Sequence, residues 1–197
     1  MTNAEKVIKI ATENNGYITT KQVKDANINT IELTRLIKQN KIERIARGYY
    51  AITNSFCDDY YKYQLKSKNC VFSHSTALYF YDLSDRTPLY FDMTVPIGYN
   101  GSLNKDKNVQ LHYVKKEFLT IGLTTIKSPF GMEIRTYDLE RTICDIVKYR
   151  NHMDKEMFTK ALKWYAKRKD KDLLKLMRYA KKLNIDKKIL EYMEVLL

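Results

Sequence analysis

Apolar residues recur at helical spacing in the first part of the chain and predict three short helices before residue 40. The first helix carries its apolar residues on one face, at Ala4, Val7, Ile8 and Ala11. It should end at Asn14-Asn15-Gly16, because Asn and Gly tolerate the left-handed backbone that closes a helix. Tyr17-Ile18 then leads to Thr19 or Thr20, either of which can cap a second helix that runs through Val23 and Ala26.

The third helix should follow Ile28, which we expect to be buried in the preceding turn, with Asn29 as its N-cap. We expect it to end at about Gln39. Its predicted inward, apolar set is Ile31, Leu33, Leu36 and Ile37. Its predicted outward set is Thr30, Glu32, Thr34, Arg35 and Lys38.

The next segment, Asn40–Ile52, alternates apolar and basic residues around Gly48. This pattern is typical of a β-hairpin with one packed face and one face toward an anion, and Gly48 permits the tight turn at its tip. Helix, turn, helix and basic hairpin is the layout of a winged helix-turn-helix, whose usual partner is duplex DNA.

Behind this segment the pattern changes to a mixture of strands and helices. Helices are predicted over Asp58–Lys66 and from about Ser73 to Leu83, with Ser73 as a cap. Strands are predicted at residues 90–95, 109–114, 123–127 and 132–136. Asp138 should cap a helix, and three more helices fit residues 154–168, 170–183 and 186–196. We therefore predict an α+β protein. A winged helix-turn-helix at residues 1–54 precedes a mixed domain at residues 55–197, with strands at about 90–136 and a helical bundle at about 138–197.

Composition favours an ordinary globular protein, with 44% hydrophobic and 29% charged residues. No apolar run approaches the roughly 20 residues that a membrane span needs, and the first residues do not resemble a signal peptide. Three cysteines (Cys57, Cys70 and Cys144) are scattered and lack the spacing of metal ligands. These features predict a cytoplasmic, reduced protein without metal or cofactor.

The net charge of +12 is unevenly distributed along the chain. Residues 1–55 hold nine basic and five acidic residues, whereas residues 56–149 hold twelve and eleven. Residues 150–197 hold fourteen basic and seven acidic residues. Basic charge at both ends favours a polyanionic partner, because each neutralised phosphate releases condensed counterions. The alternative is a solvated basic surface that serves solubility alone.

Within the predicted winged helix, the residues able to reach base edges are Asn29, Thr30, Thr34 and Arg35. Arg35 is the best candidate for a bidentate contact to guanine. Lys38 and Lys41 are better placed for phosphates. In the hairpin, Arg44 and Arg47 can point together toward the DNA backbone or minor groove, and Tyr49 or Tyr50 can add a phosphate hydrogen bond. The alternative is a winged helix that binds protein.

The last helices offer a second basic surface. Its predicted members recur mostly at three to four residues, so that many can share one face: Lys163, Lys167, Lys171, Lys175, Arg178 and Lys182. They could extend contact along DNA, meet a protein partner or its RNA, or form a solvated face.

The remaining chemical patterns are weak. A Ser/His/Asp site could be drawn from Ser73, His74, Ser75, Asp82 and Asp85, but sequence neighbours point in different directions, so we expect capping and packing instead. Asp92, Glu133 and Lys127 loosely resemble a metal-nuclease set. Arg141 and Asp145 fit an intrahelical ion pair. We therefore predict no catalytic and no metal-binding residues.

In sequence the chain resembles the AbiEi family, the antitoxins of the AbiE abortive-infection toxin–antitoxin systems. The resemblance spans residues 1 to about 150 and is carried by the order of its segments: Ile42–Tyr50, Phe72–Tyr79, Asp82–Pro88, Asp92–Pro96 and Thr136–Asp145. The final helices match in position and character without a definable motif.

The resemblance implies a DNA-binding repressor that binds inverted repeats in the promoter of its own operon. It also implies an antitoxin in phage defence that neutralises a separately encoded nucleotidyltransferase-like toxin through its C-terminal domain, with or without a stable complex. Two alternatives remain: a winged-helix transcription regulator with no toxin partner, and a nuclease guided by the winged helix.

Overall fold

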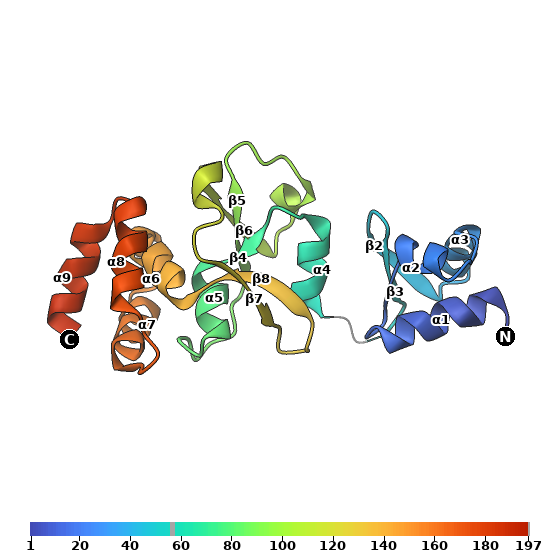
Figure 1. Cartoon of the computed structure of the whole chain (residues 1–197), viewed down its shortest axis with the longest axis horizontal. Coiled ribbons are helices and arrows are strands. Elements are labelled where there is room, and N and C mark those ends of the chain that lie inside the picture. The colour runs from blue at the N-terminus through green and yellow to red at the C-terminus, as the bar shows by residue number, and fades with distance from the viewer. Residues whose placement is uncertain (56–57, 197) are drawn as a thin grey trace. The chain divides into compact units, whose positions relative to one another are not determined.

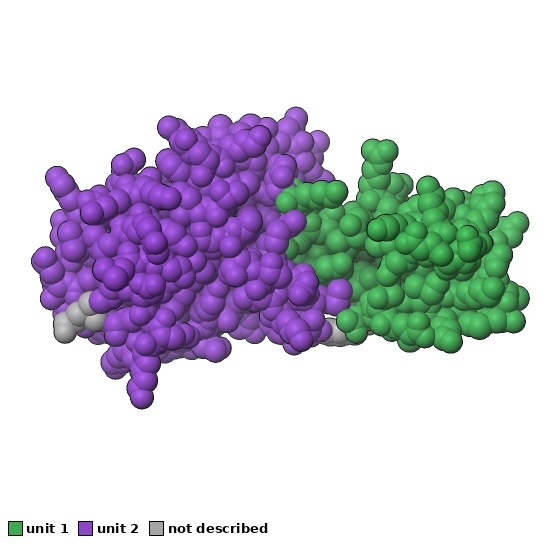
Figure 2. Space-filling model, in the orientation of Figure 1, with its two compact units in different colours: residues 1–68 green, residues 69–197 purple. Residues whose placement is uncertain are grey.

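The computed structural model describes residues 1–55 and 58–196. The chain divides into two compact units, Met1–Lys68 and Asn69–Leu197, shown in different colours in Figure 2. The division falls later in the chain than the boundary predicted near Asn54-Ser55, because the helix that follows that point is grouped with the first unit. Cys70 and Cys144 are buried, and Cys57 lies outside the described residues.

Unit 1 contains four helices and three strands among its described residues (Figure 1). The helices are α1 (Asn3–Glu13), α2 (Thr20–Asp25), α3 (Ile31–Lys38) and α4 (Asp59–Lys66). The strands β1 (Tyr17–Thr19), β2 (Ile42–Ala46) and β3 (Tyr49–Ile52) form an antiparallel sheet in the order β1-β3-β2.

Local capping interactions set the helix boundaries in unit 1. Thr2 and Glu5 form a reciprocal capping box at the start of α1, and Thr19 forms another with Gln22 at the start of α2. After α1 the backbone turns through Asn15 and Gly16, both at positive φ, as predicted. The three helices expected before residue 40 are therefore confirmed.

The two faces of the small sheet are covered by different helices. One face belongs to the core of unit 1, formed by Val7, Ala11, Ile18, Val23, Ile28, Leu33, Leu36 and Ile42. On the other side of the sheet, the Tyr17 hydroxyl donates to the Asp58 carbonyl at 3.1 Å, and the Tyr17 ring meets the Tyr61 ring edge-on at 5.0 Å. Lys62 of α4 lies 3.9 Å from Glu43 of β2. Helix α4 therefore packs against the hairpin.

Unit 2 is built on a five-stranded mixed sheet in the order β6-β5-β4-β8-β7. Its strands are β4 (Val71–Phe72), β5 (Phe91–Pro96), β6 (Val109–Val114), β7 (Leu123–Lys127) and β8 (Glu133–Tyr137). The β4–β8 and β5–β6 pairs are parallel, whereas β4–β5 and β7–β8 are antiparallel. The four strands predicted between residues 90 and 136 are confirmed, and the two-residue β4 was not predicted.

The helices of unit 2 are α5 (His74–Phe80), α6 (Leu139–Lys148), α7 (Lys155–Lys167), α8 (Leu173–Lys182) and α9 (Asp186–Leu196). Short 3₁₀ turns η1 (Ser102–Lys105), η2 (Lys116–Phe118) and η3 (Arg150–His152) lie between the other elements. Asp138 caps α6, as predicted, by accepting from the Arg141 amide at 2.9 Å. Figure 1 shows α7, α8 and α9 grouped beside α6 at the C-terminal end. Their core includes Ile143, Phe158, Leu162, Leu176 and Ile189. The α+β class is thus confirmed.

Candidate nucleic-acid interface

Helix α3 presents a continuous outward face. Leu33 and Leu36 are buried, and the residues at positions i, i+3, i+4 and i+7 on the opposite side are all exposed: Ile31, Thr34, Arg35 and Lys38. The prediction that Ile31 and Ile37 pack inward is wrong, since they are 55% and 38% exposed. Leu33 and Leu36 alone fill the contact of α3 with the core, so the outward face has an apolar residue at its N-terminal end.

Asn29, one of the predicted DNA contacts, also caps the start of α3. The side-chain oxygen of Asn29 accepts from the Ile31 amide at 3.0 Å, whereas Thr30, which occupies the cap position, makes no side-chain cap hydrogen bond. Asn29 is exposed and its amide nitrogen carries two donors. The hydroxyl of Thr30 and the amide of Asn29 therefore lie at the N-terminal end of the outward face.

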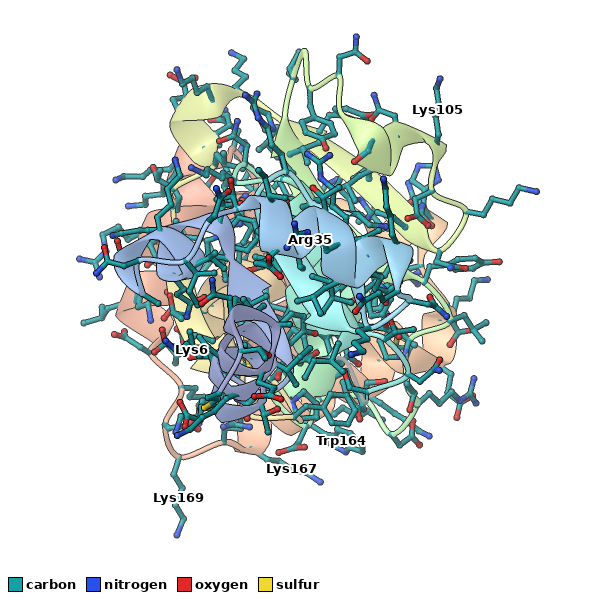
Figure 3. All side chains as sticks on the ribbon, turned by 90° about the vertical axis from the view of Figure 1, so that its right-hand side faces the viewer. Lys6, Arg35, Lys105, Trp164, Lys167 and Lys169 are labelled. Atoms are coloured by element: carbon teal, nitrogen blue, oxygen red, sulfur yellow. The ribbon has the colours of Figure 1, made fainter. Side chains whose placement is uncertain are left out.

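Arg35 lies on the side of α3 that faces the viewer in Figure 3. Its guanidinium donates to the Glu32 carboxylate, with Nη1 and Oε1 2.7 Å apart. The Arg35 side chain is 66% exposed and the Glu32 side chain 14% exposed. The pair is therefore only partly open to solvent, and Arg35 must give up this hydrogen bond to meet another acceptor.

The hairpin of β2 and β3 forms as predicted, with Gly48 at φ +80° in its turn. A bulge between Arg44 and Ala46 interrupts the pairing, and Glu43 and Arg44 are both exposed, so the alternation expected from the sequence does not continue along β2. The Thr20 amide donates to the Gly48 carbonyl at 2.9 Å. This bond connects the hairpin tip to the start of α2.

Four cations of unit 1 stand on α3 and the hairpin region: Lys38, Lys41, Arg44 and Arg47. All four are exposed, and none of them has an ion-pair partner within the described part of the chain. Tyr49 is half-buried and pairs with Thr19 and Ala46 in the sheet. Glu43, the acidic residue of β2, faces Lys62 instead. The structure thus leaves four positive charges available to a polyanion.

The comparisons bear on this same segment. Residues 5–53 match the family model described as "Transcriptional regulator, AbiEi antitoxin". The match covers α1 to β3 and does not extend into unit 2. By that description the matched segment is similar to antitoxins that are transcriptional regulators.

The fold beyond the AbiEi match is similar to a solved structure. The "Crystal structure of RV2827C protein from Mycobacterium tuberculosis" superimposes with a TM-score of 0.69 and 11% sequence identity, covering 98% of this chain and 77% of that one. At this identity the likeness concerns the fold alone. No curated protein sequence matches the chain significantly. None of the described helices is long and apolar enough to span a membrane.

The second basic surface predicted outside the AbiEi match is only partly free. Lys175 lies 2.8 Å from Glu140 and 3.1 Å from Asp138, and its pKa is raised because the hydrogen bonds to these carboxylates outweigh the effect of burial. Lys171 donates to the Arg168 carbonyl at 3.0 Å. Lys175 therefore neutralises the acidic start of α6 and is not a free surface charge, which corrects the prediction.

The other predicted members of that surface are exposed: Lys163, Lys167, Arg178 and Lys182. Lys163 and Lys167 share one face of α7 at a spacing of four residues, and Arg178 and Lys182 share one face of α8. Figure 3 shows Lys167 and Lys169 extending away from the ribbon. These four positions remain candidates for a basic surface.

The residues considered for catalysis are arranged differently from expectation. Ser73 was expected to cap α5, but it makes no cap hydrogen bond, and its hydroxyl lies 2.9 Å from Nδ1 of the adjacent His74. These neighbours therefore contact each other, and the expectation that they point apart is wrong. Ser73 is nevertheless fully buried, and Asp85 is exposed and paired with Lys160, so no accessible Ser/His/Asp site results.

The metal-nuclease set is not assembled. Asp92 is the second residue of β5 and lies 2.7 Å from His112, whereas Glu133 begins β8 and pairs with Lys127 at the opposite end of the sheet. Among the described residues, no group of three or more His, Cys, Asp or Glu side chains could hold a metal ion. Arg141 and Asp145 form the predicted intrahelical pair, at 2.9 Å.

Proposed function

We propose that the chain is a sequence-specific DNA-binding repressor of its own operon. In this proposal α1, α2, α3 and the β2–β3 hairpin act as a winged helix-turn-helix. Helix α3 is the recognition helix that enters the major groove. The match of this segment to the AbiEi antitoxin regulators supports the proposal.

The observation that carries the proposal is the combination of the outward face of α3 with the free cations around it. Arg35 would donate to the O6 and N7 acceptors of guanine, and Thr34, Thr30 and the Asn29 amide would reach neighbouring base edges. The phosphate contacts would come from Lys38, Lys41, Arg44, Arg47 and Tyr49. Two separate elements, α3 and the hairpin, would thus contact the same stretch of duplex.

Repression follows if the protein occupies inverted repeats in its promoter and excludes polymerase. We further propose that unit 2 supplies the antitoxin function against a separately encoded nucleotidyltransferase-like toxin. This second part rests on the resemblance of residues 72–145 to AbiEi antitoxins, since the matched family segment ends at residue 53. A transcription regulator without a toxin partner is the alternative.

The test is binding of the full chain to the duplex directly upstream of its own gene, compared with a scrambled duplex, at about 50 mM and about 200 mM salt. We expect a preference for the upstream duplex that persists at the higher salt. Arg35→Ala should remove about 1–3 kcal/mol of that preference. Lys9→Gln is the matched control, because Lys9 is an exposed cation of α1 that already pairs with Glu13.

Equal and salt-labile binding to both duplexes would contradict a sequence-specific repressor. Co-expression with the neighbouring toxin gene tests the second part separately. Rescue of growth by full-chain variants that no longer bind DNA would support an antitoxin function of unit 2, whereas absence of any rescue would leave a transcription regulator alone.

A further inference from the structure

A chain of buried polar side chains runs through unit 2 at the junction of β4, β5 and β6. Thr94 donates to the Ser73 hydroxyl at 2.8 Å, and the Ser73 oxygen lies 2.9 Å from Nδ1 of His74. Nearby, Nε2 of His112 lies 2.7 Å from the Asp92 carboxylate. All five side chains are buried. Buried polar groups are costly to retain, so an assembly of this size points to a function.

The imidazole rings of His74 and His112 stack closely on each other. The rings of His74 and His112 stack with centroids 3.6 Å apart and planes 16° apart, and the Tyr149 ring meets both edge-on. His74 has a φ of +47°, a left-handed backbone that is unfavourable for most residues other than Gly and Asn. Strained backbone at a fixed, buried side chain is common where a ligand is bound.

The hydrogen-bond chain sets the tautomer of His74. Because Thr94 donates to Ser73, the hydrogen of the Ser73 hydroxyl is left for Nδ1 of His74. Nδ1 is then an acceptor, and the ring carries its proton on Nε2. Burial, with a further contribution from His112, holds the pKa of His74 well below its usual value, so the ring is neutral. Nε2 has no partner among the described residues and is a fixed N–H donor.

A cavity of about 290 Å³ opens beside the stacked rings. Its lining includes His74, His112, Arg141, Asp145, Lys148 and Tyr149. Arg141 is fully buried, donates to Asp145 and to the carbonyls of Phe118 and Ile121, and keeps Nη2 without a partner in the described structure. Arg141 and Asp145 form an ion pair, and Oδ2 of Asp145 also has no hydrogen-bond partner in the described structure. Lys148 lines the cavity from the exposed end of α6 and is close enough to Asp145 to act on its carboxylate.

We propose that this cavity is a binding site for a small anion of the phosphate class. Nε2–H of His74 would donate to one anion oxygen, and Lys148 would balance the charge at the cavity mouth. The volume lies at the lower end of the range of ligand pockets and suits an inorganic phosphate or a small phosphate ester. The site lies wholly within unit 2, and it does not depend on the proposed DNA binding.

The test is a long-range ¹H–¹⁵N spectrum of the imidazoles in the full chain, recorded during titration with inorganic phosphate at constant pH and ionic strength. The chain has three histidines, so His152 serves as an internal control in the same spectrum. We expect saturable shifts of the His74 and His112 signals with an apparent Kd on the order of 1 mM. The exposed His152 should move much less.

Two variants test which side chains contribute to phosphate binding. Lys148→Gln changes only an exposed side chain and should weaken phosphate binding about threefold to tenfold. Lys187→Gln, an exposed position on α9 outside the cavity lining, is the matched control and should leave binding unchanged. His74→Asn should abolish binding, and Asn is chosen because it tolerates the left-handed backbone of this position.

Absence of a saturable shift at His74 and His112 up to tens of millimolar phosphate (roughly tenfold above the expected Kd) would overturn the proposal. So would equal weakening by Lys148→Gln and Lys187→Gln, because binding would then reflect the general positive charge of unit 2. A titration with glucose 6-phosphate against inorganic phosphate distinguishes a phosphate ester from the free ion. Tighter binding of the ester would identify an organic phosphate as the ligand.

Discussion

Arg35 donates a hydrogen bond to Glu32 across 2.7 Å, one turn apart on α3. This pair joins the best candidate for a guanine contact to the one acidic residue in the first turn of the same helix. The pair holds the guanidinium in a defined position, and the carboxylate competes with any DNA acceptor. Arg35 would thus contact a base, and Glu32 competes with that base for the same guanidinium.

Glu32→Gln should strengthen binding to the upstream duplex about twofold to tenfold at low salt. The substitution releases Arg35 and removes a negative charge from a surface that would approach phosphates. A fluorescence anisotropy titration measures the change. Glu13→Gln, which removes an acidic partner of a lysine on α1, away from the outward face of α3, should have little effect. Weaker binding by the Glu32 variant would mean that Glu32 itself contacts a base.

Ile31 should read a thymine methyl group, because its exposed side chain lies on the same face as Thr34 and Arg35. Replacing thymine by uracil at each position of the bound site removes only the C5 methyl. At one position, this replacement should weaken DNA binding by the native chain by about 1 kcal/mol. The same replacement should not change DNA binding by the Ile31→Ala variant, which lacks the side chain that contacts the methyl group. Ile37→Ala is the control, since Ile37 is exposed on a different face. Full sensitivity to uracil in the Ile31 variant would contradict this role.

Arg44→Gln and Arg47→Gln should each weaken binding to upstream and scrambled duplexes alike. Each substitution removes a phosphate contact, so the slope of log K against log salt should become shallower by about one. Titrations at several salt concentrations give this slope. A loss confined to the upstream duplex would instead place these arginines against bases.

Arg141→Met should destabilise unit 2 by about 3–5 kcal/mol, because it leaves the Asp145 carboxylate buried without its cation. Chemical denaturation followed by circular dichroism measures the loss. The double variant Arg141→Met/Asp145→Leu removes both charges and should recover much of the stability. A single variant within about 1 kcal/mol of the native chain would show that Asp145 finds another partner.

The buried His74 should make stability fall as the solution is acidified. Its pKa in the folded chain is lowered by burial and by His112, with Asp92 acting in the opposite direction and Arg141 adding to the decrease. As the pH falls, the unfolded chain therefore binds this proton before the folded chain does. The contribution of His74 to the free energy of unfolding is fully present above about pH 6.5 and is lost below it, by up to about 1.4 kcal/mol per pH unit. Denaturation of the native chain and His74→Asn between about pH 5 and about pH 7.5 isolates this term. Parallel curves would contradict the prediction.

The sequence by itself determined the local elements, because their signals lie within a few residues of each other. Thr19, Asp58 and Asp138 cap helices through hydrogen bonds to amides two or three residues away. The hairpin around Gly48 follows from one residue that favours positive φ. The basic character of its surroundings could also be read directly from the chain, as could the family resemblance that the match at residues 5–53 supports.

Only the tertiary structure decided which of these residues are free and which are buried together. Ile31 and Leu33 are equally apolar, and packing against the core distinguishes them, although the spacing of Ile31 with Thr34 and Arg35 could have indicated an outward position. Lys175 loses its free charge to Asp138 and Glu140, more than thirty residues away. His112 carried no signal in the sequence, because its partners Asp92 and His74 come from β5 and α5 and reach it only in the folded sheet. Contacts of this kind depend on which distant segments pair in the sheet, and the hydrophobic periodicity of a single segment does not specify its partner.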